Sequence, residues 1–258
     1  MIRRGSTGPD VVAWQRMLGI TADGIFGAQT EAATRTWQAA RGLVANGEVD
    51  ASAFMAAGLG GVGHRDPKPT NPDGLPYDFV ESKGLSRMGR HVVRVVVIQT
   101  MECQELKGRA RWCAEWFAGR YAPQYPAPQA SAHFMVDADE VVQGVRESDM
   151  AWHAGSANPF SIGVEHAGYA GQNAQQWDDD YSRAVLDRSA RLVAGICSRW
   201  GIPIVRLGAG ELVQGQRGIT GHVDCTNAFS KGQGHTDPGP SFPWVPYLKL
   251  VEAYAVRA

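Results

Sequence analysis

A histidine and an aspartate flank a glycine-rich stretch near the end of the chain. His222 lies in Gly-His-Val-Asp (221–224), and Asp237, 15 positions later, lies in His-Thr-Asp-Pro-Gly (235–239). An imidazole nitrogen and a carboxylate oxygen suit a catalytic zinc, which takes three protein ligands and keeps one position for water. The pair therefore predicts two thirds of a zinc site, whose third ligand must come from elsewhere.

The segments that must position such a site alternate between strand and helix patterns. Buried strands are predicted at residues 92–98 and 162–166, a hairpin at 132–136 and 141–145, and amphipathic helices at 108–119 and 178–201. This order predicts an α/β domain with a central mixed β-sheet flanked by helices.

The first sixty residues have a pattern of their own. Helices are expected from Gly-Pro-Asp (8–10) onward, around Trp37, and at 51–57, with glycine turns between them. Trp14, Phe26 and Trp37 are expected to form the core, since a small domain needs large aromatic side chains to bury enough area. The fold class predicted for the whole chain is α+β/α/β, with a small three-helix domain in front of the α/β domain.

Glycine and proline concentrate after the first domain, at 58–63 and 67–76, and this composition predicts a linker. We therefore expect domains at residues 1–60 and 86–258, joined by a Gly/Pro-rich linker at 61–85.

Composition narrows the classes of partner. A formal charge of −1 and a pI near 6.7 give no electrostatic reason to expect nucleic acid or an anionic membrane as a partner. The longest apolar run, 95–98, is too short to span a membrane, and the first residues lack the apolar core of a signal peptide, so synthesis in a cytoplasm is expected. Oligomeric state is not predicted.

Four cysteines show no metal-binding spacing, and reduced thiols are the default expectation. Cys103 and Cys113 could be bridged only if Cys103 lies in a loop folded back on the following helix, because one continuous helix would hold them about 15 Å apart.

Several ordered motifs resemble those of the type 2 N-acetylmuramoyl-L-alanine amidases, which cleave peptidoglycan. The Gly-His-Val-Asp and Thr-Asp-Pro-Gly sequences carry the resemblance, together with Phe-Pro-Trp (242–244) and the segments 131–137, 151–155 and 158–165. They span roughly residues 90–245. Residues 3–59 resemble the small three-helix peptidoglycan-binding domain of wall hydrolases. We expect binding to use the turns and polar rim near Asp23, Gln29 and Asn46, the alternative being direct stacking of a glycan on Trp14, Phe26 or Trp37.

One position departs from the amidase pattern. The family has a metal-binding histidine where Gln99 follows the apolar strand, and a glutamine carbonyl suits zinc less well than imidazole, so weakened Zn²⁺ binding is expected. Three explanations stay open: an introduced substitution that silences the enzyme, a natural variant that keeps zinc through Gln99 or a neighbour such as Glu102 or Cys103, and a natural loss of catalysis.

The resemblance also implies roles for other residues. Glu165 is expected to be the general base, the alternative being a surface ion-pair partner. His235 is expected to stabilise the oxyanion, the alternative being an ordinary loop histidine. Asp224 is expected to organise the loop that holds His222. The expected substrate-binding residues are Trp152, His153, His133 and Asn158, of which the two histidines could equally be structural.

The function implied is that of a phage endolysin: a peptidoglycan hydrolase that cuts the amide between N-acetylmuramic acid and L-alanine with zinc-activated water. It is expected in the host cytoplasm before lysis and at the bacterial cell wall afterwards, and Gln99 is expected to impair it. The alternative is a non-catalytic peptidoglycan-binding protein with a degenerate amidase domain. A cytosolic muropeptide-recycling amidase is disfavoured by the wall-binding domain.

Overall fold

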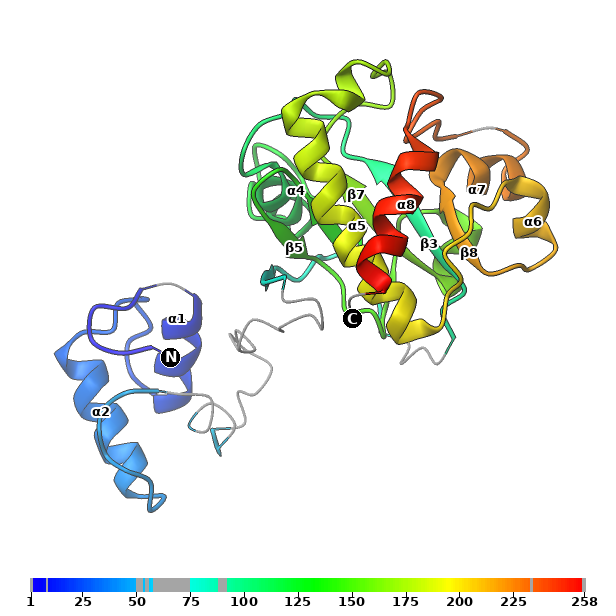
Figure 1. Ribbon diagram of the computed structural model, residues 1–258. Helices are drawn as coiled ribbons and strands as arrows, with labels where there is room; N and C mark the ends of the chain where they lie inside the picture. The colour runs from blue at the N-terminus through cyan, green and yellow to red at the C-terminus, as the bar shows by residue number, and fades with distance from the viewer. Residues whose placement is uncertain are drawn as a thin grey trace. The chain divides into compact units, whose positions relative to one another are not determined.

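The computed structural model describes residues 2–7, 9–49, 53, 56–57, 75–87, 92–232 and 234–256. Two compact units, Met1–Asp66 and Pro67–Ala258, are considered separately (Figure 1). Most of the predicted third helix at 51–57, and the predicted linker up to residue 74, fall outside the described residues.

The first unit contains the helices α1 (Pro9–Leu18) and α2 (Ala28–Ala39). Trp14 and Phe26 are fully buried, and Trp37 meets Trp14 edge to face with 4.9 Å between ring centroids. The Trp14 indole donates a hydrogen bond of 2.9 Å to Thr34 Oγ1. The predicted aromatic core is therefore confirmed. The indole nitrogen of Trp14 is satisfied, whereas the buried indole nitrogen of Trp37 has no hydrogen-bond partner within the described residues.

A hydrogen-bonded unit occurs twice in this domain, 23 residues apart. Gln15 Nε2 donates to Asp23 Oδ1 and to the carbonyl of Ile25, while Gln15 Oε1 accepts from the amide of Gly24. Gln38 makes the same three bonds to Asn46, Glu48 and Gly47. In each unit the Asx oxygen also accepts from the backbone amide two positions on.

Asp23 and Asn46 thus form turns while remaining exposed, and the expectation that a glycan contacts the rim near these turns stays a prediction. The backbone amide of Ile25 and the side chain of Gln15 lower the pKa of Asp23, because both donate to its carboxylate. Each buried glutamine bonds one backbone amide and one backbone carbonyl of a turn. These groups have no partner in a sheet or a helix, so the glutamine side chain satisfies them.

Replacing Gln38 with alanine is expected to loosen the second of these turns. The buried amide of Gly47 would lose its acceptor, a cost of about 1–3 kcal/mol. Hydrogen exchange of the Gly47 and Val49 amides in the full chain should then accelerate by about 5- to 150-fold. Gln29→Ala, an exposed position on the same helix, is the matched control, and equal exchange in the two variants would refute this role for Gln38.

A six-stranded mixed sheet forms the centre of the second unit, as predicted. Its order is β1 (Tyr77–Phe79), β5 (Val141–Gln143), β4 (Phe134–Val136), β7 (Ser161–His166), β3 (Val95–Thr100) and β8 (Gly218–Gly221). The predicted hairpin is the antiparallel pair β4–β5, and every other pairing in this sheet is parallel. A separate antiparallel pair joins β2 (Leu85–Ser86) to β6 (Met150–Ala151).

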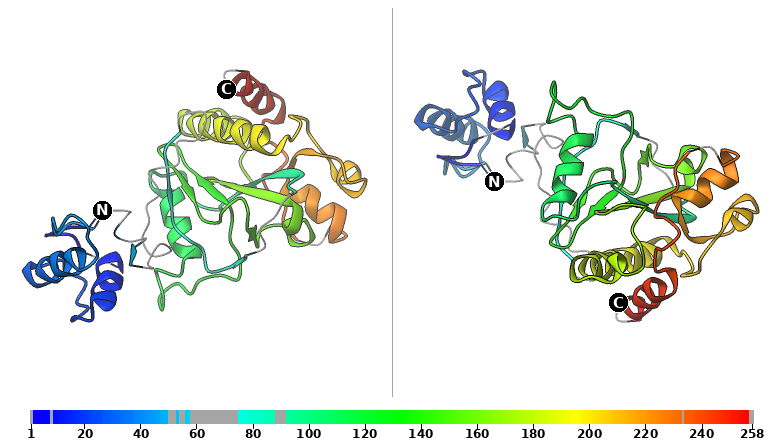
Figure 2. Two further views of the ribbon diagram at one scale, coloured as in Figure 1. Left: turned by 90° about the horizontal axis from the view of Figure 1, so that it is seen from below. Right: turned by 90° about the horizontal axis from the view of Figure 1, so that it is seen from above.

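Helices cover both faces of the sheet (Figure 2). One face packs on α5 (Asp180–Trp200) and α8 (Trp244–Ala255), and the other on α4 (Arg109–Phe117), α6 (Ala209–Val213) and α7 (His222–Phe229). Strand β3 serves both layers, since Val96 and Ile98 face α5 while Val95 and Val97 face the opposite side. The first four residues of the strand, 95–98, are consequently all apolar, as is usual for a strand buried on both faces.

The predicted linker boundary is wrong at its carboxyl end. Residues 75–86 belong to the folded unit, because β1 pairs with β5 and the ring of Tyr77 packs against Phe134 at 5.5 Å. The short strand β1 follows prolines and a glycine, whose linker-like composition masked it.

Cys103, Cys113, Cys197 and Cys225 are free thiols, so the conditional Cys103–Cys113 bridge does not form. None of the helices in the described ranges is both long enough and apolar enough to cross a lipid bilayer.

Candidate active site

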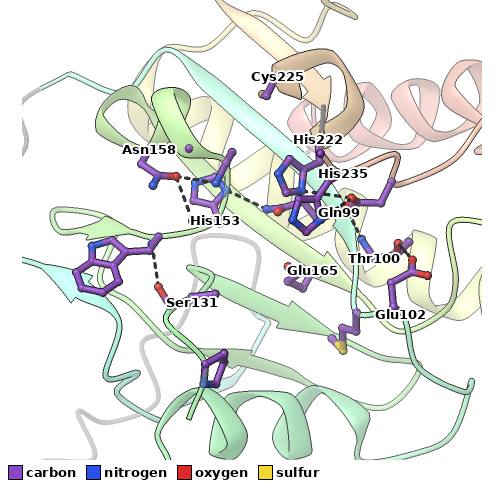
Figure 3. A pocket seen from close by; sticks show the side chains of 18 of the residues that line it. Gln99, Thr100, Glu102, Ser131, His153, Asn158, Glu165, His222, Cys225 and His235 are labelled. Atoms are coloured by element: carbon purple, nitrogen blue, oxygen red, sulfur yellow. Dashed lines mark hydrogen bonds and ion pairs between the residues drawn. The ribbon is translucent and has the colours of Figure 1, made fainter. Parts of the chain in front are cut away.

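A pocket opens where β3 and β7 end, between α4 on one side and α7 on the other (Figure 3). The sheet register places Gln99 directly beside Glu165 on the neighbouring parallel strand. Side chains alternate along a strand, so both residues project from the face opposite α5. The predicted site residues that line the pocket are Gln99, Trp152, His153, Asn158, Glu165, His222, His235 and Asp237.

His222 is the first residue of α7, directly after β8. Asp224 accepts from the amide of Gly221 at 3.0 Å and from Arg206 at 2.6 Å, and so caps this helix. The predicted role of Asp224 in organising the His222 loop thus has a concrete form: a cap braced by an arginine. Arg206 in turn lies over the ring of Trp244, 3.9 Å from its centroid.

Asp237 is held by main-chain groups. Its Oδ2 accepts from the backbone amide of Thr100 at 3.2 Å, and its carbonyl accepts from the amide of Val223 at 2.9 Å. Gly239 follows at φ +89°, where a side chain would collide with the backbone of Ala170, so the turn requires glycine there. These contacts tie the loop to both β3 and α7.

His222, His235 and Asp237 form a cluster of potential metal ligands, with one ligand atom from each lying within 4.8 Å of the others. The Nδ1 atoms of His222 and His235 lie 3.3 Å and 3.5 Å from Asp237 Oδ1. The two imidazole rings stack with centroids 4.1 Å apart. His222 and Asp237 are buried, whereas the His235 side chain is 70% exposed. The predicted ligand pair thus converges, and His235 joins it.

Gln99 is buried and hydrogen bonded to a neighbouring histidine. Its Nε2 donates to His153 Nδ1 at 2.9 Å, which leaves His153 Nε2 as the donor to Ser161 Oγ at 3.0 Å. Ser161 in turn donates to the carbonyl of Ala157. Gly163 lies beneath this pair, and a Cβ there would come within 2.5 Å of His153 and 2.7 Å of Gln99.

The residues predicted to bind substrate have different environments. Trp152 is 37% exposed at the pocket and donates its indole hydrogen to Ser86 Oγ. Asn158 Oδ1 accepts from the amides of His153 and Ala154, so it shapes the loop that presents His153.

His133 does not reach the pocket, contrary to its predicted substrate role. It is fully buried, Nδ1 accepts from the amide of Gly163, and Nε2 donates to the carbonyl of Asp149. Both ring nitrogens of His133 are thus bonded to backbone groups, and its motif in the sequence does not distinguish this structural role from substrate binding.

Glu165 combines a partly exposed side chain with a buried Oε2 that has no hydrogen-bond partner within the described part of the chain. Burial raises the pKa of Glu165 well above its ordinary value, and the negative charges of Asp237 and Glu102 raise it further. An unpartnered carboxyl group of this kind in a pocket is a candidate proton carrier.

The neighbours considered as substitute ligands do not join the cluster. Glu102 Oε1 accepts from Thr100 Oγ1 and from the amide of Ala170, and Cys103 is outside the residues that line the pocket. Sequence reasoning missed Thr100, Ser161, Gly163 and Arg206 as supports of the site. Strand alternation could have indicated Ser161 and Gly163, which share a face with Glu165, but no sequence signal indicated Arg206.

Comparisons with known proteins agree with this architecture. A family model described as N-acetylmuramoyl-L-alanine amidase matches residues 89–240, and one described as a peptidoglycan binding domain matches residues 7–56. N-acetylmuramoyl-L-alanine amidase A of Achromobacter lyticus is 33% identical over 164 residues, covering 60% of this chain and 81% of that protein.

Two solved structures are similar to part of the chain at lower identity. A selenomethionine AmpD derivative is 24% identical, with a TM-score of 0.48 over 67% of this chain and 93% of the other. The Staphylococcus aureus hydrolase AmiA in complex with its ligand is 18% identical, with a TM-score of 0.45 over 66% and 75%. Because the amidase model covers more than half of the residues, the chain belongs to the N-acetylmuramoyl-L-alanine amidase family.

Proposed function

We propose that this protein hydrolyses the amide between N-acetylmuramic acid and L-alanine in peptidoglycan. The observation that carries the proposal is the meeting of His222, Asp237 and Glu165 in one pocket of a chain that belongs to the amidase family. The matched peptidoglycan-binding domain supports the bacterial wall as the substrate.

The donor set fits zinc. His222 and Asp237 are buried, they offer a nitrogen and a carboxylate oxygen, and these atoms lie 3.3 Å apart. Zinc bonds of about 2.0–2.2 Å at tetrahedral angles would separate two ligand atoms by about 3.3–3.6 Å. Bound there, zinc would polarise the scissile carbonyl and bring the pKa of a bound water near 7.

The protein's own groups would manage the proton and the substrate. Glu165 has a carboxylate oxygen in the pocket without a hydrogen-bond partner among the described residues, so its ionised form would accept the proton of the attacking water and return it to the leaving nitrogen. Trp152 offers a partly exposed ring at the rim, against which a sugar or a peptide could pack. The loop held by Asn158 keeps His153 beside Gln99 at the pocket floor.

The two-domain architecture supports an endolysin that acts on the wall of a host bacterium after phage growth. The first domain would keep the enzyme on peptidoglycan while the second cuts, since tethering raises the local concentration of substrate. The alternative from a different class is a wall-binding protein that no longer cleaves, and Gln99 is the residue that motivates it.

Purified peptidoglycan treated with the full chain and zinc tests the proposal. We expect new amino termini, identified as alanine by end-group labelling, with no rise in reducing sugar ends. Release of reducing ends instead would indicate glycosidase activity. Sedimentation of the chain with peptidoglycan, without any new amino termini, would favour the non-catalytic alternative.

A further inference from the structure

We propose that His235 is the third protein ligand of this metal site and that Gln99 is not a ligand. The inference rests on the proposed function, because it identifies which side chains hold the zinc proposed there. It assigns to His235 a role different from the oxyanion contact expected from its position in the sequence.

The distances around Asp237 carry the first step. His222 Nδ1 and His235 Nδ1 lie 3.3 Å and 3.5 Å from the same oxygen, Asp237 Oδ1. Both values fall within the ligand-to-ligand separation of about 3.3–3.6 Å that tetrahedral zinc requires. Two nitrogens and one carboxylate oxygen also form a ligand set that zinc commonly accepts.

The local backbone keeps His235 beside His222. Gly234, at φ +145°, lies against the side chain of Thr226, and a Cβ there would approach Thr226 Oγ1 to 3.3 Å. The amide of Gly232 donates to the carbonyl of the same threonine. Thr226 belongs to α7, the helix that begins at His222, so the loop before His235 is attached to that helix.

Gln99 has a different partner. Its amide nitrogen donates to His153, whose second ring nitrogen bonds Ser161, and Gly163 leaves the space that this arrangement needs. The amide is therefore oriented by a hydrogen-bond chain within the sheet rather than by the metal cluster. Its carbonyl oxygen is also a neutral ligand, which competes poorly with an imidazole nitrogen for zinc.

A simpler reading of His235 is an exposed loop histidine that pairs with Asp237. The two readings predict different results. If His235 is a ligand, zinc binds its ring nitrogen, and substitution of His235 lowers the zinc affinity of the protein. If His235 is only a charge partner of Asp237, zinc does not bind its ring and substitution leaves the zinc affinity unchanged. His235→Lys separates them further, because lysine supplies a positive charge beside Asp237 but offers no imidazole.

The test is a zinc titration of the full chain with ¹⁵N-labelled histidine, followed by NMR of the ring nitrogens. The His235 signals are assigned by their absence in His235→Ala. One equivalent of zinc should shift the ring nitrogens of His222 and His235 together. Competition with a chelator then gives the zinc affinity of each variant.

We expect His235→Ala and His235→Lys each to lower zinc affinity by more than about 100-fold, since replacing a group that only orients a ligand already costs 10- to 100-fold. Gln99→Ala should retain affinity within about 10-fold. A His235 signal that ignores zinc, unchanged affinity in His235→Ala, or an equal loss in Gln99→Ala would overturn the inference.

The proposed function and this inference fail separately. Zinc bound through His235 without release of amino termini contradicts the function alone. Release of amino termini together with full zinc affinity in His235→Ala contradicts the assignment of His235 alone.

Discussion

Replacing His222 with alanine should lower kcat/KM on peptidoglycan by more than about 100-fold and remove bound zinc from the purified chain. The imidazole is one of two buried ligand groups in the cluster, and alanine offers no replacement donor. The fold should persist, because the helix cap made by Asp224 and Gly221 uses neither ring nitrogen of His222. Zinc content by elemental analysis and amino-terminus release by end-group labelling measure the two effects.

Lys231→Ala, an exposed position in the same region, is the matched control for His222→Ala and should keep both zinc and activity. Circular dichroism confirms that the variants fold alike. A His222→Ala chain that cleaves peptidoglycan at the native rate would exclude this cluster as the reaction centre.

Glu165→Gln is expected to lower kcat by about 10²- to 10⁴-fold while zinc remains bound. Glutamine has nearly the same shape as glutamate but cannot take up the proton of the attacking water. Stability should not fall, because burial disfavours the charged form of Glu165 and glutamine removes that charge. Measurements of kcat, zinc content and thermal unfolding distinguish this outcome from a general loss of structure.

Glu102→Gln gives the comparison within the same pocket. Glu102 is a carboxylate nearby, but its Oε1 already accepts from Thr100 and from the amide of Ala170. A role limited to these hydrogen bonds predicts a kcat close to that of the native chain. If Glu102→Gln lowers kcat as much as Glu165→Gln, the general base has been assigned to the wrong carboxylate.

Periodicity alone predicted much of the second domain. The runs that became β3, β7 and α5 are long or strongly patterned, and their burial follows the expected alternation. Strands β1 and β8 were missed because they have only 3 and 4 residues, among prolines and glycines, and short strands gain their stability from pairing partners distant in sequence.

The same distinction, between features with a local sequence pattern and features that depend on distant partners, applies to the site. The spacing of His222 and Asp237 predicted their convergence, because only 15 positions separate them; in the structure helix α7 and the loop after it join them. The position of His235 depends on how that loop attaches to α7, and the bond between Gln99 and His153 joins residues 54 positions apart. Neither contact leaves a local pattern in the sequence. His133 was wrongly predicted to bind substrate, because a polar residue in a plausible motif can instead be hydrogen bonded to backbone groups.

The group that orients Asp237 is a main-chain amide, that of Thr100. Any residue except proline supplies that N–H, so the contact survives almost every change of residue type at position 100. A change of side chain at this position would therefore leave the main-chain contact to the carboxylate in place. A designer who transplants this centre to another scaffold must therefore copy the end of a strand as well as the side chains.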